Sequence, residues 1–186
     1  YNPNRTSFRE SLLGPSAKHL LGTDFGGRDV LTRILYGARV SLVIGVLSVL
    51  LAAIIGSLLG LLCAYYGGAL DNIVMRVIEG MDAIPQIMIS MALLAVFGTG
   101  FINLAIILGI TTIPADIRMM RASALTIKNS DYMLAARLQG GSPLWQMVKH
   151  MFPNSLSPLI VMITQQVGGT IVVESGLSFM GIGISV

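Results

Sequence analysis

Charge is scarce in this chain of 186 residues: Asp, Glu, Lys and Arg together make up 11% of it, whereas hydrophobic residues make up 54%. Soluble domains carry about 25% charged residues. So few charges cannot cover a surface that faces water, and lipid must therefore cover much of the molecule. The composition excludes an ordinary soluble domain and predicts a membrane protein.

Cysteine and histidine are also nearly absent. The single Cys63 lies inside an apolar stretch, which excludes a disulfide framework within the chain. The two histidines, His19 and His150, lie far apart and lack companions at the spacing of metal ligands, so no metal site is expected. The net charge is only +3 and the basic residues are scattered, which argues against a nucleic-acid partner.

Catalytic motifs are missing as well. The glycine-rich stretch Gly22–Gly27 is not a phosphate loop, because no strand precedes it and no Gly-Lys-Ser or Gly-Lys-Thr follows it. A membrane-embedded hydrolase would need a nucleophile with a base, and no apolar stretch contains a histidine. The chain is therefore not expected to be an enzyme or to bind a cofactor.

Long apolar stretches are what the sequence does contain. Val40–Tyr66 has no charged residue, and a helix of that length reaches roughly 40 Å, more than the ~30 Å hydrocarbon layer. A second span is apolar over Ala83–Phe97 and is approached by an amphipathic segment, Ala69–Met81. The third runs from Phe101 to about position 115, and the fourth from about position 156 to 173. Four spans predict an all-α, polytopic membrane helical bundle.

Small residues recur every four positions in the first span, at Ala52, Gly56, Gly60 and Ala64. This spacing places them on one helix face, where small side chains let backbones approach closely in lipid. We expect this face to pack against another helix.

Polar residues interrupt the fourth span at Gln165, Gln166 and Glu174. Amides and carboxylates are costly against lipid, so these side chains are expected to face the bundle interior or an aqueous path. Hydrogen bonding between helices and lining of a substrate path both fit, and the two are not exclusive.

The orientation in the membrane does not follow from charge. A helical extension with Asp116, Arg118, Arg121 and Lys128 is expected to carry the third span out of the membrane. The 12 Lys and Arg residues divide equally between the two predicted sides, so the positive-inside rule gives no answer.

Residues 131–154 form a helix–turn–helix-like segment between the third and fourth spans. Gly140 and Gly141 would break its first helix, Pro143 suits the first turn of a second one, and Pro153 bounds the return into the membrane. A short helix with exposed apolar residues fits docking into a groove of a partner. The alternative is a helix that lies on lipid headgroups; the tight turn and the proline favour docking.

This segment resembles a known family motif. Ala135-Ala136-Arg137 followed by Gly140-Gly141 is similar to the cytoplasmic coupling loop, or EAA loop, of ABC importer permeases. In that family, the loop binds an ATP-hydrolysing partner subunit. The motif's glutamate is replaced here by Leu134, and Gln139 stands where an aliphatic residue is usual, which puts the polar contact to the partner in doubt.

The resemblance extends from Leu20 to the end of the chain. Gly22–Leu31, GTDFGGRDVL, looks like a signature of dipeptide, oligopeptide and nickel permeases, and Tyr36–Leu42 matches the segment that leads into the next span there. Leu177–Gly181 also follows in the expected order. Each motif alone is weak, but the ordered set is specific.

The resemblance implies an organisation. Residues 1–39 would be a pre-membrane segment, and residues 40–186 a transmembrane permease domain that includes a cytoplasmic coupling loop at 131–154. Such subunits typically have six membrane helices, so one before Tyr1 and one after Val186 are expected to lie outside this chain.

The resemblance also implies a function. The chain would be the permease subunit of a binding-protein-dependent ABC importer, in a bacterial or archaeal cytoplasmic (inner) membrane, forming the path for peptides or a related small solute. Its partners would be membrane lipid, a homologous second permease, two ATP-binding cassette subunits that hydrolyse ATP, and an extracytoplasmic solute-binding protein. The coupling-loop residues would be Ala135, Ala136, Arg137, Gly140, Gly141 and Pro153.

A passive channel or an ion-coupled secondary transporter is the alternative function. In that case, Gln165, Gln166 and Glu174 would form a selective site at the membrane midplane, and internal repeats are expected. The sequence shows no repeat. The identity of the solute does not follow from the sequence.

Overall fold

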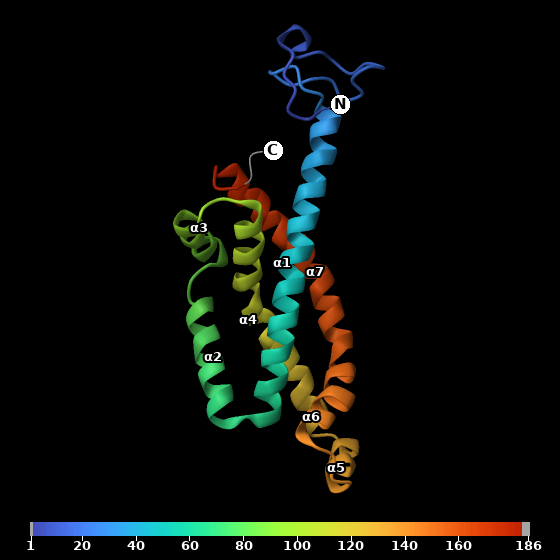
Figure 1. The fold of residues 1–186 in the computed structure, drawn as a ribbon, viewed down its shortest axis with the longest axis vertical. Helices are drawn as coiled ribbons and strands as arrows, with labels where there is room; N and C mark the ends of the chain where they lie inside the picture. Colours follow the sequence, from blue (N-terminus) through green and yellow to red (C-terminus); the bar gives the residue numbers. More distant parts are fainter. Residues whose placement is uncertain (1, 184–186) are drawn as a thin grey trace.

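The computed structural model describes residues 2–183, and these fold almost entirely into helices (Figure 1). The part of the chain described contains no extended strand beyond one isolated bridge between Thr23 and Asp29. The prediction of an all-α fold is confirmed. The elements are a 3₁₀ turn (Phe8–Glu10), α1 (Val30–Tyr66), α2 (Gly68–Asp82), α3 (Gln86–Phe97), α4 (Phe101–Lys128), α5 (Asp131–Leu138), α6 (Pro143–Gln146), a π-helical segment (Met147–Met151) and α7 (Phe152–Phe179).

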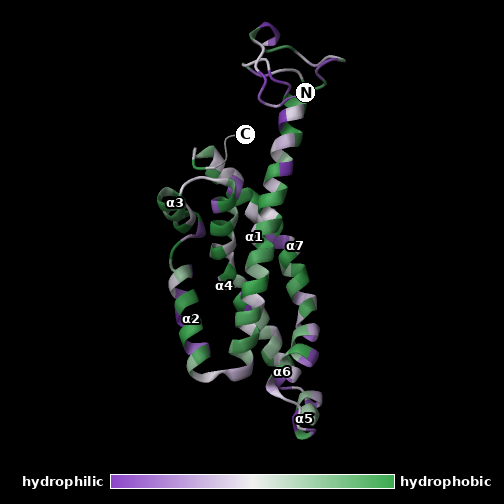
Figure 2. Ribbon diagram, viewed as in Figure 1, coloured by the Kyte–Doolittle hydropathy of each residue, from purple (hydrophilic) through white to green (hydrophobic). Residues whose placement is uncertain are grey.

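Within residues 2–183, three helical stretches are long and apolar enough to cross a membrane: α1, α4 and the continuous stretch Pro143–Phe179. Helices α2 and α3 together also pass this test but meet at an angle of 88°, so they form a broken span or a re-entrant loop. Counting this pair as one span gives the four predicted. The hydrophobic colouring runs along these helices, whereas the N-terminal segment carries much of the hydrophilic colouring (Figure 2).

Helix α1 begins at Val30, ten residues before Val40, where the sequence analysis placed the start of the first span. Asp29 caps it, because its carboxylate accepts hydrogen bonds from the Thr32 backbone N–H (2.8 Å) and hydroxyl (2.6 Å). The sequence placed the start at Val40 because Arg33 and Arg39 are charged, but a helix can continue past the membrane where its cap lies in water.

Helix α4 joins the third span and the charged extension into one helix, despite Pro114. The extension, which was predicted to carry the third span out of the membrane, contacts α2 through ion pairs. Arg121 forms a two-point ion pair with Asp71 of α2, at 2.5 and 2.6 Å, and Arg118 pairs with Asp82. These ion pairs have a physical reason, because charges at a membrane boundary are stabilised by opposite charges on a neighbouring helix.

Helix α1 packs along α4, and α7 packs against both. Two groups of buried apolar residues fill the bundle, one near the end of α1 that faces the N-terminal segment and one near the opposite end. The first contains Ile44, Leu94, Leu104, Ala105, Ile107, Leu108 and Leu177, and the second contains Leu61, Ala64, Met120, Ala124, Met133, Met147, Met151 and Leu159.

The N-terminal segment and the α5–α6 segment lie at opposite ends of the elongated molecule (Figure 1). The first group of buried residues therefore supports one end of the bundle, and the second group mounts α5 and α6 on the other.

Candidate functional site

The segment between α4 and α7 folds as two short helices with a tight turn. Gly140 follows α5 with a positive φ of 79°. Residues with a Cβ adopt this backbone conformation only at a cost in conformational energy. The Gly141 N–H donates to the carbonyl oxygen of Ala136 (3.2 Å), and Ser142 accepts a hydrogen bond from the Trp145 N–H (3.3 Å), so α6 begins at Pro143. The turn is therefore defined by its own hydrogen bonds.

The predicted docking residues do not all face outward. Ala135, Arg137 and Gly140 are exposed, whereas Ala136 is buried beside Met133 and faces the bundle. Gly141 is half-buried, and a Cβ there would come 2.7 Å from the Trp145 ring. Ala136 and Gly141 therefore shape the turn, whereas their sequence neighbours Ala135, Arg137 and Gly140 are accessible.

Large apolar side chains cover the outer surface of this segment, which we call the docking face. Leu138, the most exposed of them, is 81% exposed, and Leu134, where the family motif has a glutamate, is also exposed. A shallow hollow between the helices is lined by the 139–142 turn and Trp145. The docking face consists of Leu134, Leu138, Leu144, Trp145 and Val148.

Pro153 lies in the first turn of α7 and is exposed. The π-helical segment Met147–Met151 joins α6 to α7 without a break, so Pro153 lies within the continuous helical stretch Pro143–Phe179. Helices α6 and α7 are therefore parts of one helical stretch.

The structure separates the three polar residues of the fourth span. Glu174 is buried and accepts hydrogen bonds from the hydroxyls of Ser41 on α1 (2.8 Å) and Ser178 (2.9 Å). Gln165 is exposed on a different face, and Gln166 is half-buried. Glu174 thus joins α7 to α1, and only Gln165 is freely accessible.

Asp116 is a buried carboxyl that the sequence analysis placed at the start of the charged helical extension. Its side chain is fully buried in α4, and neither carboxyl oxygen has a hydrogen bond of normal geometry within residues 2–183. The Gln166 side chain of α7 lies close enough to interact with it. Nothing in the sequence separates Asp116 from the charged residues that follow it, because its burial depends on the packing of α1.

The four small residues of α1 are all buried and line its contact with α4. A Cβ on Gly56 would overlap the Cβ of Asp116, and a Cβ on Gly60 would lie 2.6 Å from the carbonyl oxygen of Ile117. Ala52 and Ala64 are 0% and 1% exposed. The two helix backbones lie too close here for larger side chains.

The N-terminal signature builds a compact cap on α1. The Asp24 carboxylate accepts hydrogen bonds from the N–H groups of Gly26 (2.8 Å) and Arg28 (2.9 Å) and pairs with Arg33 (2.6 Å). The bond from the Arg28 N–H is the main cause that lowers the pKa of Asp24. The signature Gly22–Leu31 is therefore explained by folding of the cap.

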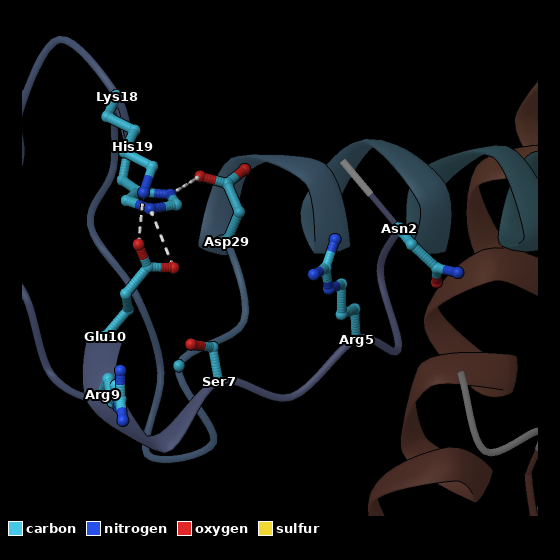
Figure 3. Close-up of a pocket in the computed structure, with 9 residues that line it drawn as sticks. Asn2, Arg5, Ser7, Arg9, Glu10, Lys18, His19 and Asp29 are labelled. Atoms are coloured by element: carbon cyan, nitrogen blue, oxygen red, sulfur yellow. Dashed lines mark hydrogen bonds and ion pairs between the residues drawn. The ribbon is translucent and has the colours of Figure 1, made fainter.

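A polar pocket lies within this cap (Figure 3). The buried His19 ring lies 2.9 Å from the Asp29 carboxylate, and Lys18 pairs with Glu10 nearby. The Thr32 hydroxyl, followed by His19, lowers the pKa of Asp29 to about 2. No group of three or more Cys, His, Asp or Glu side chains within residues 2–183 is arranged to hold a metal ion.

Residues 56–186 match the family model described as the inner membrane component of binding-protein-dependent transport systems. The chain is 39% identical to the glutathione transport system permease protein of Pectobacterium atrosepticum, over 91% of this chain and 56% of that protein. It is 39% identical to the di/tripeptide transport system permease protein of Pseudomonas aeruginosa, over 99% of this chain and 63% of that protein. It is 38% identical to the dipeptide transport system permease protein of Haemophilus influenzae, over 91% of this chain and 58% of that protein.

The family match covers most of the chain, and the relatives cover nearly all of it, although the chain spans only 56–63% of the length of these three relatives. The candidate spans make it a multi-pass membrane protein. The chain therefore belongs to the family of inner membrane components of binding-protein-dependent transport systems.

Proposed function

We propose that this chain is part of the permease subunit of an ABC importer and forms the translocation path for peptides or a related small solute across a bacterial or archaeal inner membrane. The names of the three relatives, which transport glutathione, di- and tripeptides, and dipeptides, support this solute class. The observation that carries the proposal is the docking face, an exposed apolar surface at the end of the molecule opposite the N-terminal cap (Figure 1).

The docking face fits a groove on an ATP-binding cassette subunit. Leu138 and Leu144 project from the two short helices, and a tight turn holds these helices together. Apolar residues on a short helix bind grooves because their burial removes apolar surface from water. Ala135, Arg137 and Gly140 are accessible beside them, whereas Ala136 and Gly141 maintain the shape of the turn and Pro153 starts α7. ATP hydrolysis takes place in that partner and not in this chain.

The remaining partners follow from the same proposal. Two ATP-binding cassette subunits serve a pair of permeases, of which this chain is one, and a solute-binding protein delivers the solute to the face that carries the N-terminal cap. Gln165 is exposed in the membrane span and faces the second permease or the solute path. Glu174 joins α7 to α1 inside the bundle, and Gln166 is half-buried beside Asp116 of α4.

Transport requires two arrangements of the helices that the ATPase binds unequally, because a partner shifts an equilibrium only through differential affinity. Closure of the ATPase pair would displace α5 and α6, and the continuous helix Pro143–Phe179 would carry this displacement into the membrane. A passive channel or ion-coupled carrier is less well supported, because Glu174 is engaged by Ser41 and Ser178 and lies away from Gln165.

Cysteine crosslinking tests the proposal in the full-length subunit, with Cys63 replaced by alanine. Arg137→Cys is expected to crosslink to the ATPase subunit in membranes, and ATP should change the yield. Phe8→Cys, at an equally accessible position on the cap, is the matched control and should not crosslink to that subunit. Absence of a crosslink from both Arg137→Cys and Leu138→Cys would contradict the docking assignment.

A further inference from the structure

Helix α1 is a candidate membrane span of 37 residues that carries the N-terminal cap, yet it is distant in sequence from the α5–α6 segment. Helices α4 and α7 flank that segment and are connected to it through the chain. A displacement of α5 and α6 therefore reaches α4 and α7 directly through the chain, but it reaches α1 only through packing and hydrogen bonds. Movement of α5 and α6 can therefore reach α1 through the contacts near its end.

Lys128, the last residue of α4, binds the end of α1. Its Nζ donates hydrogen bonds to the carbonyl oxygens of Ala64 (2.9 Å) and Tyr65 (2.7 Å) and lies 5.8 Å from the centre of the Tyr65 ring. Carbonyl groups in the last turn of a helix lack N–H partners within it, and their partial negative charge attracts a cation. Lys128 therefore caps α1 with a charge that belongs to α4.

Tyr65 also binds the α5–α6 segment. Its hydroxyl donates to Oε1 of Gln146 (3.4 Å), a side chain that is 4% exposed. The Gln146 Nε2 in turn donates to the carbonyl oxygen of Gly141 (2.6 Å), in the turn between α5 and α6. One buried amide thus connects the end of α1 to the turn beneath the docking face.

The α5 helix closes the arrangement from the other side. The Arg137 guanidinium donates through Nη2 to the carbonyl oxygen of Lys128 (3.4 Å), so the residue beside the docking face contacts the residue that caps α1. Met133 of α5 and Met147 share one buried apolar group with Leu61 and Ala64 of α1. The segment is therefore mounted on α1 by both polar bonds and apolar packing.

We propose that Lys128, Tyr65 and Gln146 form a joint that transmits movement of the ATPase-bound segment to α1. This inference rests on the proposed function. The three residues would position α1 relative to α5 and α6 without touching the ATPase or the solute. Gln146 is buried, Lys128 and Tyr65 are half-buried, and none of the three belongs to the docking face. Loss of the joint should therefore leave ATPase binding intact while α1 no longer follows α5 and α6.

The test uses the complete importer, with full-length subunits, reconstituted in vesicles. Solute uptake per ATP hydrolysed is measured with a radiolabelled dipeptide or radiolabelled glutathione, whichever the wild-type importer takes up. Lys128→Met keeps the aliphatic chain but removes the charge and the hydrogen bonds. We expect it to bind the ATPase subunit as the wild type does and to lower uptake per ATP about tenfold, within the usual range of coupling between two sites.

Three further variants make the result specific. Lys128→Arg, which restores the cation, should recover most of the uptake per ATP, and Tyr65→Phe, which removes one hydroxyl, should show a smaller loss than Lys128→Met. Arg76→Met is the matched control, because Arg76 is an exposed cation on α2, and it should behave as the wild type.

Two results would overturn the joint. In one, Lys128→Met and Tyr65→Phe both transport with the wild-type ratio. In the other, Lys128→Met loses ATPase binding, which would make Lys128 a residue for folding of the segment and not for transmission. Failure of the proposed function itself would be seen separately, as a wild-type subunit that binds no ATPase.

Discussion

Gly56 occupies a position where α1 and α4 leave no room for a side chain. Gly56→Ala would place a Cβ against the Cβ of Asp116 and force the two helices apart. We expect this substitution to lower the free energy of unfolding by about 1–3 kcal/mol, as overpacking of a well-packed core does. Unfolding by SDS in mixed micelles measures the change.

Gly37→Ala is the matched control for this prediction. Gly37 lies in the same helix, and a Cβ there would have no atom within 4 Å. The free energy of unfolding should stay the same or rise by up to about 1 kcal/mol, because alanine favours a helix over glycine. Equal stability of the two variants would contradict the close approach of α1 and α4 at Gly56.

The same contact shows what sequence reasoning could and could not reach for single residues. The spacing of Ala52, Gly56, Gly60 and Ala64 predicted one small-residue face, because the helix period alone fixes which residues share a face. The burial of Asp116 and the separation of Gln165 from Glu174 could not be predicted, because both depend on which helix lies alongside. The partners Ser41 and Gln146 are likewise distant in sequence from the groups that they bind.

Individual helices were predicted unequally well. The break at Gly140 and the restart at Pro143 followed from local chemistry, since a positive φ and an N-terminal proline are properties of single residues. The start of α1 was missed, whereas the helical extension that follows Pro114 was predicted and is part of α4. Hydropathy detects where lipid begins, whereas a helix ends where its cap or its neighbours allow.

The cap of α1 gives a prediction at the scale of one element. Hydrogen bonds from Thr32 and the nearby His19 lower the pKa of Asp29 to about 2, from an ordinary value of 3.8. A carboxyl with a lowered pKa in the folded state stabilises that state above its ordinary pKa and loses this effect as pH falls. We therefore expect the N-terminal cap to be constant in stability near neutral pH and to loosen between about pH 4 and pH 2.

Hydrogen exchange of residues 12–29, corrected for the intrinsic effect of pH, measures this change. Asp29→Asn keeps a capping side chain but removes the charge, so it should lower protection at neutral pH and flatten the profile below pH 4. Glu79→Gln, at an exposed position on α2, should leave the profile of the N-terminal cap as it is in the wild type. A wild-type profile in Asp29→Asn would show that the ionised carboxylate does not hold the cap.

At the scale of the whole molecule, the N-terminal cap and the docking face lie at opposite ends (Figure 1). The count of basic residues left the orientation open, but the elongated bundle means that one measurement fixes both ends together. We expect Leu138→Cys to react with a membrane-impermeant thiol reagent only in inside-out vesicles and Phe8→Cys only in right-side-out vesicles. Both positions are 81% exposed, so access to the reagent and not burial decides the result, and Cys63→Ala removes the one native thiol. The reverse labelling would place the docking face outside the cell, where no ATPase subunit could reach it, and would contradict the importer. Labelling of both positions from the expected sides would show that the outer end of α1 carries the N-terminal cap and that its inner end contacts Lys128. Transmission of movement between the two sides of the membrane requires this arrangement.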